Sequence, residues 1–232
     1  MRTENFVQSA DRRDFLGKIS GAAAIFGIAS VANPAKANAG LQKKTRLAGD
    51  PEEWFKSVKG KHRMVFDCTA PKQTFPFAWP KVFLMTNAAT GSPEKDCGVV
   101  VVLRHDAIFY AFGDALWAKY KFGEAYKIND PVTKAAATTN PFWNTSPDEF
   151  KIPGVGAVQL GIRDLQASGV MFCVCHVAIT VHSATTAAQM NLEPATVKNE
   201  WIAALLPGIQ SMPSGVWAVG RAQEHGCAYC YV

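Results

Sequence analysis

The stretch Gly169-Val-Met-Phe-Cys-Val-Cys-His-Val-Ala-Ile-Thr180 decides the fold class. Its apolar run, Val170–Val174, is typical of a β-strand, and after Cys175-His176 the pattern predicts a helix over Val177–Met190. In a parallel sheet, such a junction lies at the carboxyl edge, where ligands of open α/β folds bind. A thiol beside a helix N-terminus is a candidate reactive group, but cysteine is also among the most commonly buried residue types. Cys175 is therefore either a reactive thiol or a small buried apolar side chain.

Further β-type runs alternate with helix-like stretches along the chain. The pattern predicts strands at His62–Cys68, Cys97–Leu103, Ile209–Met212 and Cys227–Val232, with Ile108–Phe112 as a candidate extension of the sheet. It predicts helices at Pro51–Lys56, Lys81–Ala89, Asp114–Lys119, Val158–Ser168, Ala195–Leu206 and Val216–Glu224. The unbroken apolar run Cys97–Leu103 is typical of a strand buried on both faces. This alternation predicts an α/β fold, with a parallel sheet that carries helices on both faces.

The N-terminal residues 1–39 have the features of an export leader. Asp11-Arg-Arg-Asp-Phe-Leu16 resembles the twin-arginine signal, the apolar stretch Ile19–Val31 follows it, and Ala37-Asn-Ala39 supplies a small-x-small cleavage pattern. We expect cleavage before Gly40 and export to the periplasm. The apolar stretch is short and rich in Gly and Ala for a membrane span, so membrane contact is expected only through an uncleaved leader.

The mature chain is expected to consist of an N-terminal extension, residues 40–61, and one α/β domain, residues 62–232. Residues 121–153 form a long, polar, proline-bearing insertion in this domain, and loops of that length are usually lids, contact segments or disordered. Removal of the leader takes away five of the 24 basic and three of the 19 acidic residues, which leaves a net charge of +3. This mild charge, without a basic stripe of interleaved aromatics, argues against nucleic acid as a partner.

No cofactor or metal is expected from the motifs. The sequence has no G-x-G-x-x-G, Walker loop or H-E-x-x-H pattern. Cys68, His105, Cys175 and His176 lack the spacing of a zinc site. Cys227-Ala-Tyr-Cys230 has C-x-x-C spacing, but it opens a strand rather than a helix, so we interpret it as structural.

Several longer motifs together resemble one known family. They are Val102-Leu-Arg-His105, Ala111-Phe-Gly-Asp-Ala-Leu-Trp-Ala-Lys-Tyr120, the Gly169–Cys175 strand, and Pro213-Ser-Gly-Val-Trp-Ala-Val-Gly-Arg-Ala-Gln-Glu-His-Gly226. Their residues and order resemble the DsrE/DsrF-like family, and most closely its exported branch with a twin-arginine leader. The resemblance covers most of the chain from the first predicted strand to the C-terminus.

The resemblance implies a fold and a chemistry. The fold is a three-layer α/β sandwich with a five-stranded parallel sheet in the order 2-1-3-4-5. Family members with known roles carry sulfur as a persulfide on a cysteine that follows the third strand, and they assemble into oligomers. Cys175 matches that cysteine position. With this strand order, the ends of strands one and three are neighbours, so Cys68 is expected near Cys175.

Four further side chains are candidates for the site around Cys175. Arg104 and His105 follow the second strand and suit anion binding and proton transfer, or else helix capping and ion pairing. His176 follows Cys175 directly and either favours its thiolate or points away. Ser214 precedes a predicted helix, where it is either an N-cap alone or part of an anion site.

Two functions are compatible with these observations. The first is a DsrE-like periplasmic protein that carries sulfur as a persulfide, or acts as a redox protein, through Cys175. It would form a homo-oligomer and work with a sulfur-donor or acceptor protein. The alternative is a non-catalytic binding or assembly subunit of a periplasmic complex. Its contact surface would be the insertion, which carries Phe142, Trp143 and Phe150.

Overall fold

The computed structural model describes residues 49–232, and the predicted leader lies outside them. Five parallel strands form the central sheet: β1 (His62–Cys68), β2 (Cys97–Leu103), β5 (Met171–Cys175), β6 (Ile209–Met212) and β7 (Ala228–Tyr231). The five predicted strands are therefore confirmed, and β1, β2 and β6 have the predicted bounds. No helix within residues 49–232 is long and apolar enough to cross a bilayer.

The strand order is β6-β5-β2-β1-β7, which in chain order is 4-3-2-1-5. The expected order 2-1-3-4-5 is wrong, because β2 lies between β1 and β5. Cys68 is in register with Leu103, and Leu103 is in register with Val174. The ends of β1 and β5 are thus two strand spacings apart, about 9–10 Å. A disulfide between Cys68 and Cys175 would need Cα atoms within about 7 Å, and all six cysteines are free thiols.

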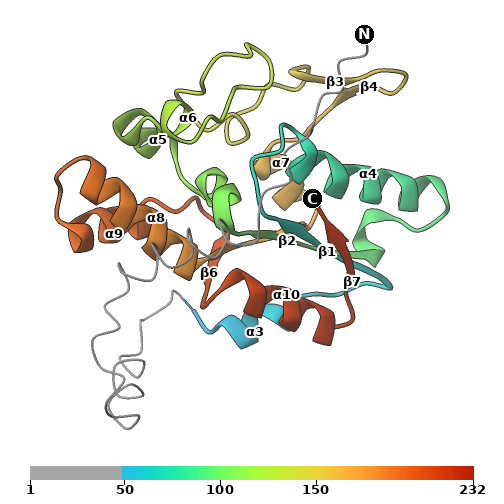
Figure 1. Cartoon of the computed structure of the whole chain (residues 1–232). Helices are drawn as coiled ribbons and strands as arrows, with labels where there is room; N and C mark the ends of the chain where they lie inside the picture. Colours follow the sequence, from blue (N-terminus) through green and yellow to red (C-terminus); the bar gives the residue numbers. More distant parts are fainter. Residues whose placement is uncertain (1–48) are drawn as a thin grey trace, which may run out of the picture. The chain divides into compact units, whose positions relative to one another are not determined.

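Helices cover both faces of the sheet. The helices are α3 (Pro51–Phe55), α4 (Phe75–Ala89), α5 (Asp114–Tyr120), α6 (Phe122–Ala125), α7 (Ile162–Ala167), α8 (His176–Gln189), α9 (Pro194–Ala203) and α10 (Gly215–Glu224). Figure 1 shows α3 and α10 on one side of the sheet, with α4 and α7 on the other. In the sheet, β1, β2, β5 and β6 follow one another in one direction, and β7 lies on the other side of β1. Right-handed crossovers therefore place α10, which leads to β7, on the face opposite the helices that connect the other strands.

The central strand β2 explains how the two cores form. Every residue of β2 is buried, and its side chains alternate between the faces. Val99 and Val101 pack in the larger core with α4, α7, α8 and α9, whereas Val100 and Val102 pack in the smaller core with α3 and α10. The unbroken apolar run of β2 therefore serves two cores at once.

Three local predictions differ from the structure. His105–Ala111 is a 3-10 helix, η2, rather than a strand extension, because a short buried apolar run has the same appearance in either state. Helix α4 begins at Phe75, six residues before the predicted start. Pro76 lies in its first turn, where a proline loses no internal hydrogen bond, and the helix continues through Pro80 in its interior. Helix α7 is shorter than predicted, since β3 (Phe150–Ile152) and β4 (Gly156–Val158) form an antiparallel hairpin before it.

The insertion at residues 121–153 packs into the core. Buried Asn140 donates from Nδ2 to the carbonyl oxygens of Tyr110 and Phe112, each at 2.9 Å. Buried Phe142 stacks on Phe77 with ring centroids 4.1 Å apart. Phe142 and Phe150 are both buried, so these two side chains do not form the exposed contact surface expected of the insertion.

We predict that Gly98→Ala destabilises the fold by about 2 kcal/mol or more, as overpacking of a core does. A Cβ atom at Gly98 would lie 2.2 Å from the backbone oxygen of Lys59, so the chain before β1 would have to move. The matched control is Gly220→Ala in α10, where a Cβ atom meets nothing within 4 Å. The free energy of unfolding of Gly220→Ala is expected to rise by about 0.5–1 kcal/mol, because alanine is favoured over glycine inside a helix. Equal unfolding free energies for the two variants in urea titrations would contradict this account of the packing.

Candidate functional site

A cavity of about 350 Å³ opens at the carboxyl edge of the sheet. It lies where β2 and β5 end and where α8 and α10 begin. Its polar lining comes from Arg104, His105, Cys175, His182 and Ser214, and its apolar lining from Val177, Ala178, Val181 and Val216. The structure therefore brings together four of the predicted site residues, Arg104, His105, Cys175 and Ser214, and adds His182.

Cys175 is both the last residue of β5 and the N-cap of α8. Its Sγ accepts a hydrogen bond from the backbone N–H of Ala178 at 3.3 Å, and the residue is only 7% exposed. The N-terminus of this 14-residue helix carries partial positive charge. The Cys175 Sγ thus accepts a backbone hydrogen bond at the positive end of a helix, and Cys175 lines an open cavity.

Arg104 reaches this cavity in a fixed orientation. Its Nε donates to Oδ1 of Asp67 at 2.6 Å and its Nη2 to Oδ2 at 2.8 Å, a bidentate ion pair. The hydrogen bonds with Asp67 raise the pKa of the guanidinium, and the Cys175 thiol is close enough to contribute in the same direction. Arg104 and Cys175 both line the cavity, so a fixed cation and a thiol share it.

Gly215, the first residue of α10, leaves room for the Arg104 side chain. A Cβ atom at Gly215 would lie 2.4 Å from Cβ and 2.7 Å from Cδ of Arg104. Before it, Ser214 caps α10, because its Oγ accepts from the N–H of Trp217 at 3.2 Å. The N-termini of α8 and α10 thus open into the same cavity.

His182 was missed by the sequence analysis. It lies seven residues after Cys175 on α8, a spacing that returns to the same side of a helix. Asp106 Oδ1 lies 3.3 Å from Nε2 of His182 and 3.2 Å from Nδ1 of His105. Burial lowers the pKa of His182, against the opposing effect of Asp106. The heptad spacing from Cys175 is the signal that could have revealed it.

The other two predicted site residues lie outside the cavity lining. Cys68 is fully buried, and burial, followed by the charge of Asp67, raises the pKa of its thiol. His176 is 9% exposed, and neither of its ring nitrogens has a hydrogen-bond partner in the described part of the chain. Burial, followed by the charge of Lys198 on α9, lowers the pKa of His176. The structure thus supports the interpretation that His176 points away from Cys175.

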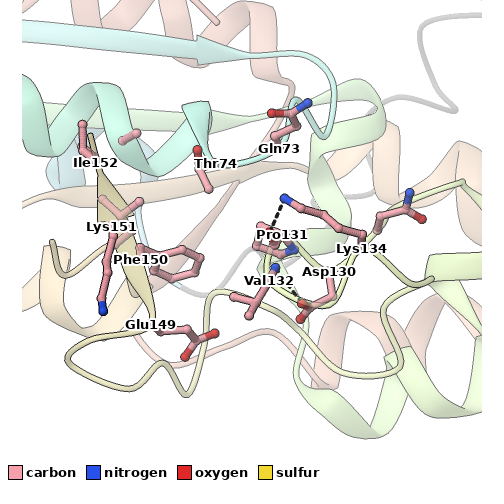
Figure 2. A pocket seen from close by; sticks show the side chains of 13 residues that line it. Gln73, Thr74, Asp130, Pro131, Val132, Lys134, Glu149, Phe150, Lys151 and Ile152 are labelled. Carbon is pink, nitrogen blue, oxygen red and sulfur yellow. Dashed lines mark hydrogen bonds between the residues drawn. The ribbon is translucent and has the colours of Figure 1, made fainter. Parts of the chain in front are cut away.

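A second cavity, of about 430 Å³, lies between the insertion and the start of α4. Figure 2 shows Thr74, Lys134 and Phe150 pointing toward its centre. The Lys134 Nζ donates to the Pro131 oxygen at 2.6 Å, and Asp130 Oδ1 accepts from the N–H groups of Val132 and Thr133. Its charged groups therefore largely stabilise turns of the insertion itself. None of the six predicted site residues lines this cavity.

Within residues 49–232, no group of three or more His, Cys, Asp and Glu side chains is arranged to hold a metal ion. Cys175, Arg104 and the two histidines thus form a site whose chemistry is that of a thiol beside a cation and imidazole groups.

Comparisons with known proteins leave the family open. No protein-family model matches the chain, and no curated protein matches its sequence. Among solved structures, the chain is similar to a protein of unknown function from Methanobacterium thermoautotrophicum. That match has 15% sequence identity and a TM-score of 0.37, and covers 74% of this chain and 100% of the other. At this level the similarity carries no argument about function.

We predict that His176→Leu makes the protein more resistant to acid. Because the fold lowers the pKa of His176, the unfolded chain binds a proton at this residue more readily than the folded chain does. The free energy of unfolding is therefore unaffected by this titration above about pH 6.5, and it falls as the pH drops from there through the lowered pKa. Leucine removes this titration and two unpaired buried nitrogens, so the free energy of unfolding should rise by about 1 kcal/mol at neutral pH.

The matched control is His62→Gln, since His62 is exposed. Urea unfolding between pH 7.5 and 5 should show a smaller loss of stability for His176→Leu than for the wild type or the control. Parallel pH profiles for all three proteins would contradict the prediction.

Proposed function

We propose that the protein is a thiol-based carrier that holds sulfur as a persulfide on Cys175. The observation that carries this proposal is the position of the Cys175 Sγ at the N-terminus of α8, beside Arg104 and facing a cavity. A helix N-terminus and a nearby cation favour a thiolate, the form of cysteine that attacks sulfur.

The loading step balances without an added oxidant. The Cys175 thiolate attacks the outer sulfur of a persulfide R–S–SH, a new S–S bond forms on Cys175, and the donor S–S bond breaks. The donor leaves as the thiolate R–S⁻ with the bonding electron pair, and Cys175 becomes Cys175–S–SH. Attack on this outer sulfur by an acceptor thiolate regenerates the free thiol.

The cavity residues have separate roles in this proposal. Arg104 stabilises the negative charge on the attacking and the carried sulfur. His105 and His182, both held by Asp106, exchange protons with the leaving thiol. Ser214 keeps the N-terminus of α10 in place beside the cavity. The largely buried position of Cys175 protects the carried sulfur from bulk solvent.

The resemblance to the DsrE/DsrF-like family supports the proposal, through the match at Cys175 and through helices on both faces of a five-stranded parallel sheet. We infer from this arrangement a three-layer sandwich. The twin-arginine pattern supports export to the periplasm, where a sulfur-donor or acceptor protein and a second copy of the chain are the proposed partners.

Treatment of the mature protein with glutathione persulfide should add one sulfur atom to Cys175. The matched control cysteine is Cys230, which is more exposed than Cys175. If the site governs the reaction, labelling of Cys175 should exceed that of Cys230 by about tenfold, which corresponds to about 1.4 kcal/mol in the barrier. Peptide mapping by mass spectrometry measures both. An adduct on Cys230 with none on Cys175 would reject the assignment.

The alternative function, a non-catalytic binding or assembly subunit, is favoured by one observation. Val177, Val181 and Val216 are exposed at the mouth of the cavity. Apolar side chains grouped at one place on a surface are suited to contact with another protein. On this alternative, the contact surface is this valine group rather than the insertion.

The assembly alternative predicts that Val216→Lys lowers the molar mass measured by light scattering, while Cys175→Ala leaves it unchanged. The matched control is Val155→Lys, since Val155 is also exposed and lies in the turn between β3 and β4. An unchanged mass for Val216→Lys would remove the support for this surface as an assembly contact.

A further inference from the structure

Three side chains from neighbouring strands connect the edge of the sheet to the Cys175 cavity. Tyr229 on the edge strand β7 donates from its hydroxyl to Oδ2 of Asp67 at 2.8 Å. Asp67 on β1 in turn accepts from Nε and Nη2 of Arg104, the residue that follows β2. The order of the strands, β7-β1-β2, makes this chain of hydrogen bonds continuous.

Asp67 does not line the cavity. It is a charged group in a buried position, where the loss of hydration costs free energy. It is only 2% exposed, and an isolated carboxylate at such a position would be strongly disfavoured. One of its oxygens accepts from Nε of Arg104, and the other accepts from both Nη2 and Tyr229. With these bonds, the position of Asp67 fixes the plane of the guanidinium.

Arg104 is therefore held from two sides. Asp67 holds the Nε and Nη2 edge of its guanidinium, and α10 packs against its aliphatic carbons at Gly215. The remaining nitrogen, Nη1, makes no hydrogen bond within residues 49–232. This nitrogen is available to a ligand in the cavity that Arg104 lines.

We propose that Asp67 and Tyr229 are positioning residues that fix Arg104 beside Cys175, and that the cavity thereby selects sulfur compounds that carry negative charge. This inference rests on the proposed function for its substrate, a sulfur donor. The selection arises because the guanidinium and the N-termini of α8 and α10 all present positive charge to the cavity. Tyr229 acts only through Asp67 and Arg104, so its effect on Cys175 depends on the presence of Arg104.

Two methanethiosulfonate reagents of similar size test the selection, one with an anionic sulfonatoethyl group and one with a cationic trimethylammonioethyl group. In the labelling step, the Cys175 thiolate attacks the reagent sulfur, an S–S bond forms, the S–SO₂ bond breaks and methanesulfinate leaves with the electron pair. The readout is the rate ratio of the anionic to the cationic reagent at Cys175, divided by the same ratio for free glutathione. Peptide-resolved mass spectrometry separates Cys175 from the other cysteines.

The wild type is expected to prefer the anionic reagent by about tenfold, within the range of electrostatic focusing in clefts. Arg104→Met should remove most of the preference and leave only the contribution of the two helix N-termini, and Tyr229→Phe should reduce it by about two- to threefold, as expected for the loss of one hydrogen bond. Tyr231→Phe is the matched control. Tyr231 is exposed on the same strand and its hydroxyl bonds to Thr69 instead of Asp67.

A double-mutant cycle separates positioning from a general structural effect. Tyr229→Phe should have no further effect in the Arg104→Met background. Gly215→Ala, which displaces Arg104 from its other side, should lower the preference as Tyr229→Phe does, and it provides a second test should Tyr229→Phe fold poorly. An equal effect of Tyr229→Phe with and without Arg104, equal effects of the two tyrosine variants, or no anionic preference in the wild type would overturn the proposal.

The outcome is distinguishable from that of the persulfide experiment. Methanethiosulfonates report only the charge around the Cys175 thiol, and glutathione persulfide reports whether the thiol accepts sulfur. Selective labelling without persulfide uptake would reject the sulfur carrier and retain the charge selection. Persulfide uptake without selective labelling would reject the charge selection and retain the sulfur carrier.

Discussion

The ion pair between the buried Asp67 and the partly exposed Arg104 is the interaction on which the geometry of the site depends. It joins the end of β1 to the residue after β2, and the aliphatic carbons of Arg104 pack against the start of α10. Removal of one partner of a buried pair typically costs about 3–5 kcal/mol, because the other charge is left without compensation. The pair is thus a strong constraint on how the ends of β1, β2 and the start of α10 meet, which is where the cavity forms.

The insertion contributes to the same framework from the other face of the sheet. Asn140 bonds to the backbone of η2, which directly follows Arg104, and Phe142 packs on Phe77 of α4. The backbone N–H of Asp106 also donates to the oxygen of Thr69, just after β1. The contact with Thr69 holds the start of η2, which carries His105 and Asp106, and the insertion holds its end, at Tyr110 and Phe112.

The positions of the strands in the chain could be predicted from the sequence, but the order of the strands in the sheet could not. An apolar run such as Val99–Leu103 has the same composition whichever strands lie beside it, so the order was inferred from a resemblance and was wrong. Cys175 at the strand-to-helix junction could be predicted because junction chemistry is local. The partners of Asp67 could not, since they lie 37 and 162 residues away in the chain. His176 illustrates the opposite limit, because adjacency to Cys175 in sequence gave no information about its direction.

The pairing of Arg104 with Asp67 also bears on release of a bound anion. A guanidinium without a carboxylate partner would present its full charge to an anion in the cavity and would hold that anion more strongly than the paired group does. Asp67 neutralises most of that charge at longer range, so the pair acts as a dipole whose positive end faces the cavity. In the proposed function the protein must accept its cargo and give it up again, and a dipole provides a preference for anions without the retention that a full charge would cause. Asp67, which is buried, hydrogen-bonded on both oxygens and absent from the cavity wall, meets this requirement of the proposed function.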